Sequence, residues 1–198
     1  MADNYLERKM EEHRKGALCR TVRKVATAGC KPGVWQLPFV ERRVLIVGTG
    51  QSVDAMLVES LRNVGCKVAF MGGESDAGVA LARKTGAQFH PVDYECEEDL
   101  RRSVALICRA WGDIDVVVGT AVECPFAIVE AWAEFRSNKP YPNPFGGRLV
   151  AVASAEWSDD AKSLLLPYGV TTAVVKSDDD ATIVDVVMMA LIHKFTVL

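Results

Sequence analysis

Two glycines directly after a short apolar run are the first residues of this chain whose spacing suggests chemistry. In the stretch "VLIVGTGQSVDAM", residues 44–56, Gly48 and Gly50 follow four apolar residues. Glycines at this place let the backbone turn tightly and approach a phosphate, while the N–H groups and dipole of the next helix face the anion. Ser52 can donate a hydrogen bond to a phosphate oxygen, or it can cap that helix. The turn therefore predicts a site for a nucleotide or another anion.

Asp54 complicates this interpretation because it adds a carboxylate two residues after Ser52. An acid in the first turn of a helix suits the helix dipole, yet it would repel a pyrophosphate at the same end unless it pointed away. Gly72, at the end of the next predicted strand, stands where an acidic residue usually holds an adenosine ribose; Glu74 and Asp76 follow it. A Gly-x-Gly turn alone is common. A working dinucleotide site, an altered one and a plain structural turn all stay open.

Two further side chains fall where a parallel sheet usually meets its ligands. Ser154 ends a predicted central strand, and Cys124 lies just past another. A catalytic serine needs a base or acid partner, and the sequence offers no identifiable one, so a turn-forming role competes with catalysis. Cys124 has no neighbouring histidine or charge pattern that would lower its pKa, which favours simple burial.

Metal binding is not expected from the cysteines and histidines of this chain. The six cysteines form no C-x-x-C pair, and the three histidines lie far from them in the sequence. The acidic run at 177–180 is explained by Ser177 as a helix cap that is followed by acids in the first helical turn. The sequence therefore predicts no metal site.

The elements that must position these residues alternate regularly from residue 44 onward. Buried apolar runs typical of strands are followed by segments with helical spacing of apolar residues. Strands alternating with helices build right-handed parallel βαβ units. The pattern predicts an α/β fold, a doubly wound parallel six-stranded sheet (Rossmann-like, order 3-2-1-4-5-6). The predicted strands lie at 44–48, 67–71, 87–93, 114–119, 148–154 and 170–175, and the helices at 52–65, 76–86, 96–112, 125–137, 159–166 and 178–195.

Residues 1–40 read as an N-terminal helical arm and linker, and residues 41–198 as the Rossmann-like domain. Between residues 13 and 43, eight lysines and arginines stand against one glutamate, in a chain whose net charge is −3. Such a basic arm can fold back on the acidic body, reach a partner subunit or bind a polyanion. No nucleic-acid motif accompanies the charge, so we expect no nucleic acid partner and a homo-oligomer, with the arm as the candidate contact.

Composition limits the class of protein. The 198 residues are 49% hydrophobic and 25% charged, which suits one globular domain without disulfides. No apolar run approaches the roughly 20 residues of a membrane helix, and the charged N-terminus lacks the apolar core of a signal peptide. We therefore expect no membrane partner and a cytoplasmic location, where the cysteines stay reduced.

Several segments in the right order resemble the short-chain dehydrogenase/reductase family over residues 43–198. They are the glycine turn already quoted, "FHPVDYECEEDL", "WGDIDVVVGTA", "GGRLVAVAS" and "LLPYGVTTAVV". The resemblance implies NAD or NADP as cofactor, Asp93 at the adenine and Ser154 at the place of the catalytic serine. The cofactor-binding residues that it implies are Gly48, Thr49, Gly50, Gln51, Ser52, Val53, Gly72, Asp93, Gly119, Thr120 and Ala121.

The chain departs from that family where catalysis is concerned. Between Ser154 and Gly169 there is no Tyr-x-x-x-Lys, because Tyr168 directly precedes Gly169 and is followed four residues later by Thr172. We therefore expect a short-chain-dehydrogenase-like Rossmann protein that binds a dinucleotide or another nucleotide or anion without the family's usual catalytic residues.

Two alternatives to this expectation stay open. The first is an active NAD(P)-dependent oxidoreductase with an altered site, in which Tyr5, Lys24 or Lys31 of a neighbouring subunit supplies the missing groups. The second is a non-catalytic, oligomerising scaffold protein, in which the sheet is a framework and the basic arm docks a partner.

Overall fold

A computed structural model describes residues 42–48, 52–73, 75–120, 124–140, 143, 146–152, 155–176 and 179–192. The arm predicted at residues 1–40 lies outside this part of the chain, so its helical character and its role in oligomerisation stay predictions. None of the helices that the structure describes is long and apolar enough to cross a membrane.

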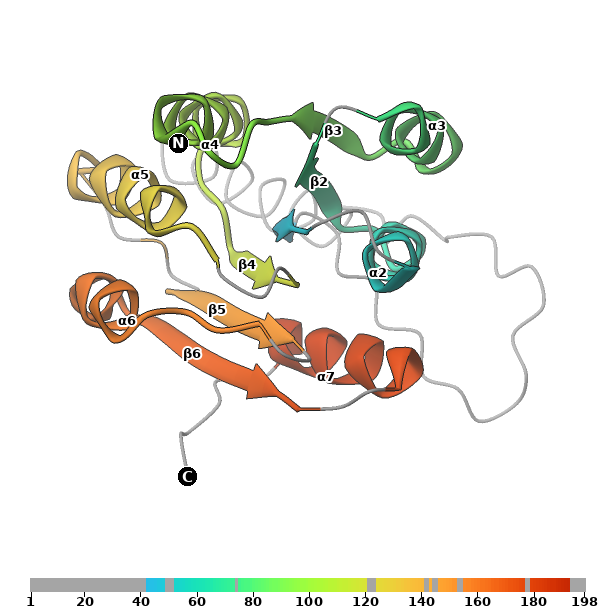
Figure 1. The fold of residues 1–198 in the computed structure, drawn as a ribbon. Helices are drawn as coiled ribbons and strands as arrows, with labels where there is room; N and C mark the ends of the chain where they lie inside the picture. The colour runs from blue at the N-terminus through green and yellow to red at the C-terminus, as the bar shows by residue number, and fades with distance from the viewer. Residues whose placement is uncertain are drawn as a thin grey trace, which may run out of the picture. The chain divides into compact units, whose positions relative to one another are not determined.

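The described residues form one six-stranded parallel sheet in the order β3-β2-β1-β4-β5-β6, which confirms the predicted fold (Figure 1). β1 pairs with β2 on one side and with β4 on the other, so the chain winds outward in both directions from β1. The strands are β1 (Arg43–Val47), β2 (Lys67–Gly72), β3 (Gln88–Pro91), β4 (Val116–Gly119), β5 (Gly147–Val152) and β6 (Val170–Val175).

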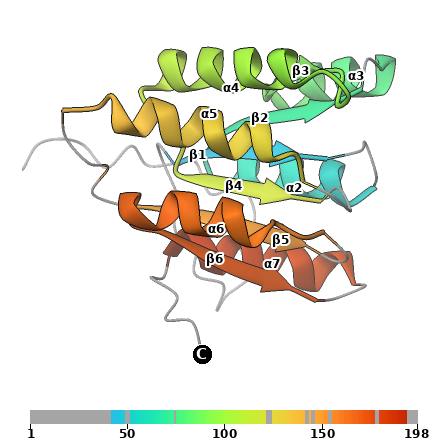
Figure 2. The same cartoon turned by 60° about the vertical axis from the view of Figure 1, so that its left-hand side comes forward.

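Helices cover both faces of this sheet. α2 (Ser52–Asn63), α3 (Asp76–Thr85) and α7 (Asp180–Ile192) pack on one face. α4 (Glu97–Trp111), α5 (Phe126–Ser137) and α6 (Asp159–Leu165) pack on the other, and the short 3-10 helix η1 (Leu166–Tyr168) follows α6 (Figure 2). The strands β1, β4 and β5 are consequently almost fully buried, as strands covered on both faces should be.

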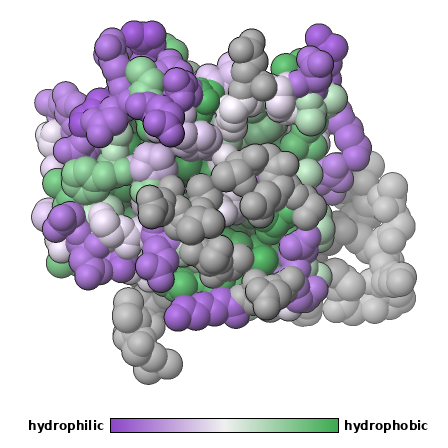
Figure 3. All heavy atoms as spheres, in the orientation of Figure 1, coloured by the Kyte–Doolittle hydropathy of each residue, from purple (hydrophilic) through white to green (hydrophobic). Residues whose placement is uncertain are grey.

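The helix sequences explain which side of each helix meets the sheet. In α4 the predicted apolar face, Leu100, Val104, Ile107 and Cys108, is buried. The opposite side of this helix is charged, and Figure 3 shows hydrophilic residues gathered over α4. Amphipathic spacing of this kind directs one stripe of a helix to the core and leaves the other in water.

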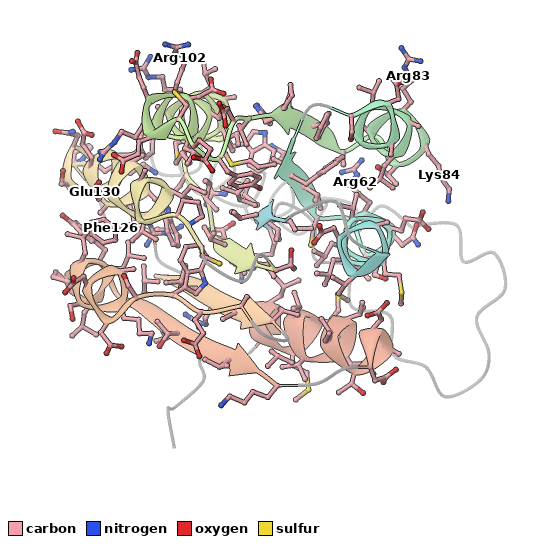
Figure 4. The ribbon with its side chains drawn as sticks, viewed as in Figure 1. Arg62, Arg83, Lys84, Arg102, Phe126 and Glu130 are labelled. Carbon is pink, nitrogen blue, oxygen red and sulfur yellow. The ribbon has the colours of Figure 1, made fainter. Side chains whose placement is uncertain are left out.

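α2 and α3 are joined by side chains near their C-terminal ends. Arg62 donates a hydrogen bond to the carbonyl oxygen of Thr85 (3.1 Å) and another to the carbonyl of Cys66 (2.7 Å), and it lies between the two helices in Figure 4. Lys84 and Glu59 form an ion pair at 2.7 Å. This pair is largely exposed and contributes little stability, so Arg62 is the more important link.

A buried polar network holds the amino end of the sheet, opposite the ends of the strands where ligands are expected. Arg43 donates hydrogen bonds to both carboxylate oxygens of Asp115, from Nε at 2.9 Å and from Nη2 at 2.7 Å. Asn143 donates to Asp115 and to Asp113, at 2.9 and 3.0 Å. Arg136, only 7% exposed, donates to Asp113 and to the carbonyl oxygen of Ile114. The network therefore ties β1, α5 and the entry to β4 together.

This network predicts a pH-dependent part of the stability. Burial raises the pKa of Asp115, but hydrogen bonds from Arg43 and Asn143 together with the Arg43 charge outweigh it, so the pKa is lowered overall. The resulting stabilisation is present above the unfolded-state pKa of about 4. It is lost as the pH falls through the lower folded-state pKa.

Asp115→Asn should therefore lower the free energy of unfolding at pH 7 by about 2 kcal/mol and flatten its decline between neutral and acidic pH. Urea unfolding of the full chain across this pH range measures both effects. Asp185→Asn, which removes an exposed carboxylate in α7, is the matched control. Equal pH profiles for wild type and Asp115→Asn would contradict the role of the network.

Candidate nucleotide site

The carboxyl ends of β1, β2 and β4 bring three of the predicted site glycines together. Gly48 directly follows β1, Gly72 ends β2 and Gly119 ends β4. In the sheet register, Val47 is level with both Met71 and Gly119. Because β2 and β4 lie on opposite sides of β1, this edge is the topological switch point at which doubly wound sheets bind ligands.

Backbone hydrogen bonds continue one residue past the ends of β4 and β3 at this edge. The amide of Thr120 donates to the carbonyl oxygen of Val47 (2.9 Å), and the amide of Val92 donates to that of Gly72 (2.9 Å). Thr120, a predicted site residue, is thereby held beside β1. Asp93, another predicted site residue, directly follows Val92 in the sequence. These two hydrogen bonds join the carboxyl end of β1 to that of β4, and the carboxyl end of β2 to that of β3.

Asp54 turns its carboxylate inward, toward the ends of β1 and β4. The residue lies in the first turn of α2 and is 5% exposed. Its carboxylate accepts a hydrogen bond from the hydroxyl of Thr120 and lies so close to Gly48 that a Cβ there would overlap it. Gly48 is therefore required by lack of space, and Asp54 fills the space between helix and strand.

Tyr94 braces the same turn from the other side. Its hydroxyl donates a hydrogen bond to the carbonyl oxygen of Gly48 at 2.6 Å. Burial, and then the charge of Asp54, raises the pKa of Tyr94, so the phenol keeps its proton and remains a donor. Sequence analysis missed this residue; its only signal was an aromatic side chain directly after Asp93.

Asp93 is exposed at this edge and shapes the loop that leads into α4. Its carboxylate accepts a hydrogen bond from the amide of Glu95 (3.0 Å), and its own amide donates to the carboxylate of Asp99 (3.2 Å). The loop therefore holds the Asp93 side chain in a defined orientation at the surface.

Cys124 and Trp157 pack together over the end of β4. A Cβ on Gly119 would overlap the Cys124 sulfur and approach the Trp157 ring. Burial raises the pKa of Cys124 to about 12, so the thiol stays protonated at neutral pH and is a poor nucleophile. The indole N–H of Trp157 donates to the carbonyl oxygen of Val150 (3.0 Å). Both residues serve packing, which for Cys124 is the interpretation favoured from the sequence.

Several predicted site residues cannot be located. Thr49, Gly50, Gln51, Ala121 and Ser154 lie outside the described residues, as do Glu74 and Ser177. Ser52 begins α2, but its side chain is not among those described. Val53 is 7% exposed and packs into the core under α2, which leaves its backbone for any contact with a ligand. The roles of these residues stay predictions.

Tyr168 lies at the wrong end of the sheet to act at this edge. It ends η1, before Gly169 and β6, and its carbonyl oxygen accepts a hydrogen bond from Arg136 (3.4 Å). Arg136 belongs to the polar network at the amino end. Lys176 directly follows β6, six strand residues away from Gly169. The two residues are therefore separated by the length of β6 and form no catalytic pair.

Neither a metal centre nor the groove between α4 and α5 adds to this site. Among the described side chains, no group of three or more His, Cys, Asp or Glu is placed to hold a metal ion. A groove of about 630 Å³ lies between α4 and α5 and is lined by charged side chains such as Arg102, Arg109 and Glu134. It contains none of the predicted site residues.

The comparisons with known proteins support the fold and say less about the activity. No family model matches the chain. A probable galactose dehydrogenase, GalD from Rhizobium meliloti (strain 1021), is 30% identical over 100 residues, which are 48% of this chain and 39% of that protein. The matched part is thus well under half the length of this curated relative.

Solved structures of similar fold include several short-chain dehydrogenases. A metagenomic short-chain oxidoreductase in complex with NADP aligns with a TM-score of 0.63 and 14% identity, over 79% of this chain and 93% of that one. BdcA (YjgI) from E. coli aligns over the same shares with a TM-score of 0.58 and 19% identity. A short-chain dehydrogenase/reductase from Serratia marcescens BCRC 10948 aligns with a TM-score of 0.51 and 18% identity, over 71% of this chain and 75% of that one.

The chain is therefore a Rossmann-like α/β protein. More particularly, it has the fold of the short-chain dehydrogenases, which confirms the resemblance predicted from the sequence at the level of the fold.

The contact between Gly48 and Asp54 yields a stability prediction. Gly48→Ala should lower the free energy of unfolding by about 2 kcal/mol, because its methyl group overlaps the Asp54 carboxylate. Combining it with Asp54→Gly should recover most of this loss, since the obstructing side chain is gone. Gly73→Ala is the control, because a Cβ there meets no atom within 4 Å. Chemical denaturation of the wild type, Gly48→Ala, Asp54→Gly, the double variant and Gly73→Ala measures the coupling. Strictly additive losses from the two single substitutions would argue against the contact.

Proposed function

We propose that this chain is a short-chain-dehydrogenase-like Rossmann protein that binds a dinucleotide, NAD or NADP, or a related nucleotide, without the usual catalytic residues of that family. The observation that carries the proposal is the convergence of Gly48, Gly72 and Gly119 at the switch point of the sheet. Doubly wound sheets bind their ligands at this edge. The space beside Gly48 and Gly119 is filled by neighbouring side chains, whereas a Cβ on Gly73, directly after β2, would meet no atom within 4 Å. A protein of the same fold was solved in complex with NADP, which supports a dinucleotide as the kind of ligand.

The residues present suit the adenosine half of such a ligand. A side chain at Gly73 would meet nothing within 4 Å, which indicates open space beyond the end of β2. The exposed carboxylate of Asp93 can accept a hydrogen bond from the amino group of adenine. The first turn of α2 carries the N–H groups and the dipole that attract phosphates in such folds, and Asp54 lies in the same turn. When bound, a nicotinamide cofactor would supply hydride transfer, while these residues would only hold and orient it.

Turnover is not part of the proposal, because no described residue takes the place of the missing catalytic tyrosine and lysine. Tyr168 and Lys176 are far apart, and the thiol of Cys124 is protonated. The spacing Tyr-x-x-x-Lys does occur once in the chain, at Tyr5 and Lys9, outside the described residues. An active oxidoreductase completed by the arm of a neighbouring subunit, and a scaffold that oligomerises through that arm, therefore stay predictions, as does a cytoplasmic location.

Isothermal titration calorimetry of the full chain with NAD, NADH, NADP, NADPH and adenosine tests the proposal. We expect saturable binding of adenosine and of at least one dinucleotide at the same site, so that each displaces the other. No heat with any of the five would refute it.

Asp93→Ala sharpens this test. It should weaken adenosine binding about tenfold, because it removes a hydrogen bond to a charged acceptor. Asp99→Ala removes the hydrogen bond to the amide of Asp93 in the same loop but leaves the Asp93 carboxylate in place, and it should change the dissociation constant by less than about threefold. If the two variants lose affinity equally, loop order and not an adenine contact accounts for the effect.

A further inference from the structure

We propose that Asp54 determines which ligands the site accepts: its buried carboxylate disfavours a diphosphate next to Gly48 and shifts the preference toward nucleosides with little negative charge there. The inference rests on the proposed function, since it concerns the same site. It goes beyond that function by naming the residue that sets the ligand's charge class.

The first support is the location of the charge. The carboxylate lies against Gly48, in the first turn of α2. That is where backbone N–H groups and the helix dipole otherwise attract a phosphate. An acid in this turn already complements the positive end of the helix, so a bound diphosphate would gain less there and would face a second negative charge.

The second support is the burial of the charge. Asp54 is 5% exposed, and Thr120, whose hydroxyl donates to it, is 7% exposed. Charges in such surroundings are poorly screened by water and salt, so their effect reaches neighbouring groups. After burial, the negative charge of Asp54 is the next contribution to the raised pKa of the Tyr94 phenol. Tyr94 donates a hydrogen bond to the Gly48 carbonyl oxygen, so the charge of Asp54 acts on groups around Gly48.

A purely structural role is the competing explanation. Asp54 links α2 to Thr120 and fills the space beside Gly48, so its loss would weaken the packing of the turn. A packing role predicts that a substitution changes the binding of all ligands together, in step with stability. A charge role predicts that only ligands with phosphates respond.

Asp54→Asn in the full chain separates these explanations, because the amide has nearly the same shape and can still accept the Thr120 hydrogen bond. Calorimetry with adenosine, AMP, ADP and NADP at one fixed salt concentration gives the four dissociation constants. We expect ADP and NADP to bind to Asp54→Asn at least about tenfold more tightly than to the wild type, because the substitution removes a negative charge that repels their phosphates. Adenosine should change by less than about twofold.

Two further variants complete the design. Asp54→Gly removes both the charge and the bulk of the side chain, and it should favour ADP binding at least as strongly as Asp54→Asn does. Thermal unfolding shows which of the two variants is folded. If only one of them folds, its dissociation constants alone test the inference. Asp185→Asn makes the same change at an exposed residue of α7, away from the proposed site, and should leave all four dissociation constants unchanged.

The outcomes distinguish this inference from the proposed function. If adenosine and NADP bind but the ratio of their affinities is the same in wild type and Asp54→Asn, the inference is overturned and the proposed function stands. If NADP binds only to the Asp54 variants, the inference is supported and dinucleotide binding by the natural chain is refuted. If no protein binds any of the four ligands, both fail.

Discussion

The pairing of β1 with β2 on one side and with β4 on the other is the constraint on which the rest of the structure depends. A parallel sheet must be covered on both faces, and the helices that connect its strands provide that cover in two layers. At the amino end the buried network around Asp115 and Arg43 fixes β1 against β4. At the carboxyl end Gly48 directly follows β1 and Gly119 ends β4, and the helices that come next, α2 and α5, cover opposite faces of the sheet. The proposed site is thus a consequence of topology: the buried network holds one end of the sheet, and the strand ends meet at the other.

At the functional end, packing and chemistry are combined in the same few atoms. The carboxylate of Asp54 fills the space beside Gly48 and accepts a hydrogen bond from the hydroxyl of Thr120. Its negative charge also contributes to the raised pKa of Tyr94. A glycine in place of Asp54 would let the helix approach the strand closely and leave the helix dipole available to a phosphate. The Asp54 carboxylate holds α2 against Thr120, and its negative charge interacts with the helix dipole as a bound phosphate otherwise would. A sheet of dehydrogenase type can thus retain its architecture while its preference for ligands changes.

The sequence was sufficient for the fold because the order of the strands follows from regular alternation, from long-known connection rules and from continuous apolar runs such as that at 44–47. The resemblance to the short-chain dehydrogenases singled out Gly48, Gly72, Gly119 and Thr120, and the structure places these residues at the edge where the parallel strands end. Their role in binding stays a prediction. The sequence could not give the direction of the Asp54 side chain, which depends on how α2 packs against Thr120. Nor did it reveal Tyr94 or the network around Asp113 and Arg136, because such partners are far apart in the chain and carry no periodic signal.

Binding of a nucleotide at the carboxyl ends of β1, β2 and β4 is tested most directly by a crystal structure of the full chain soaked with NADP. We expect electron density for the adenosine half beside Gly72 and Asp93, with the Asp54 carboxylate still directed at Gly48 and Thr120. Density for the ligand elsewhere, for example in the groove between α4 and α5, or no density at this edge with the ligand in large excess, would contradict the proposed site.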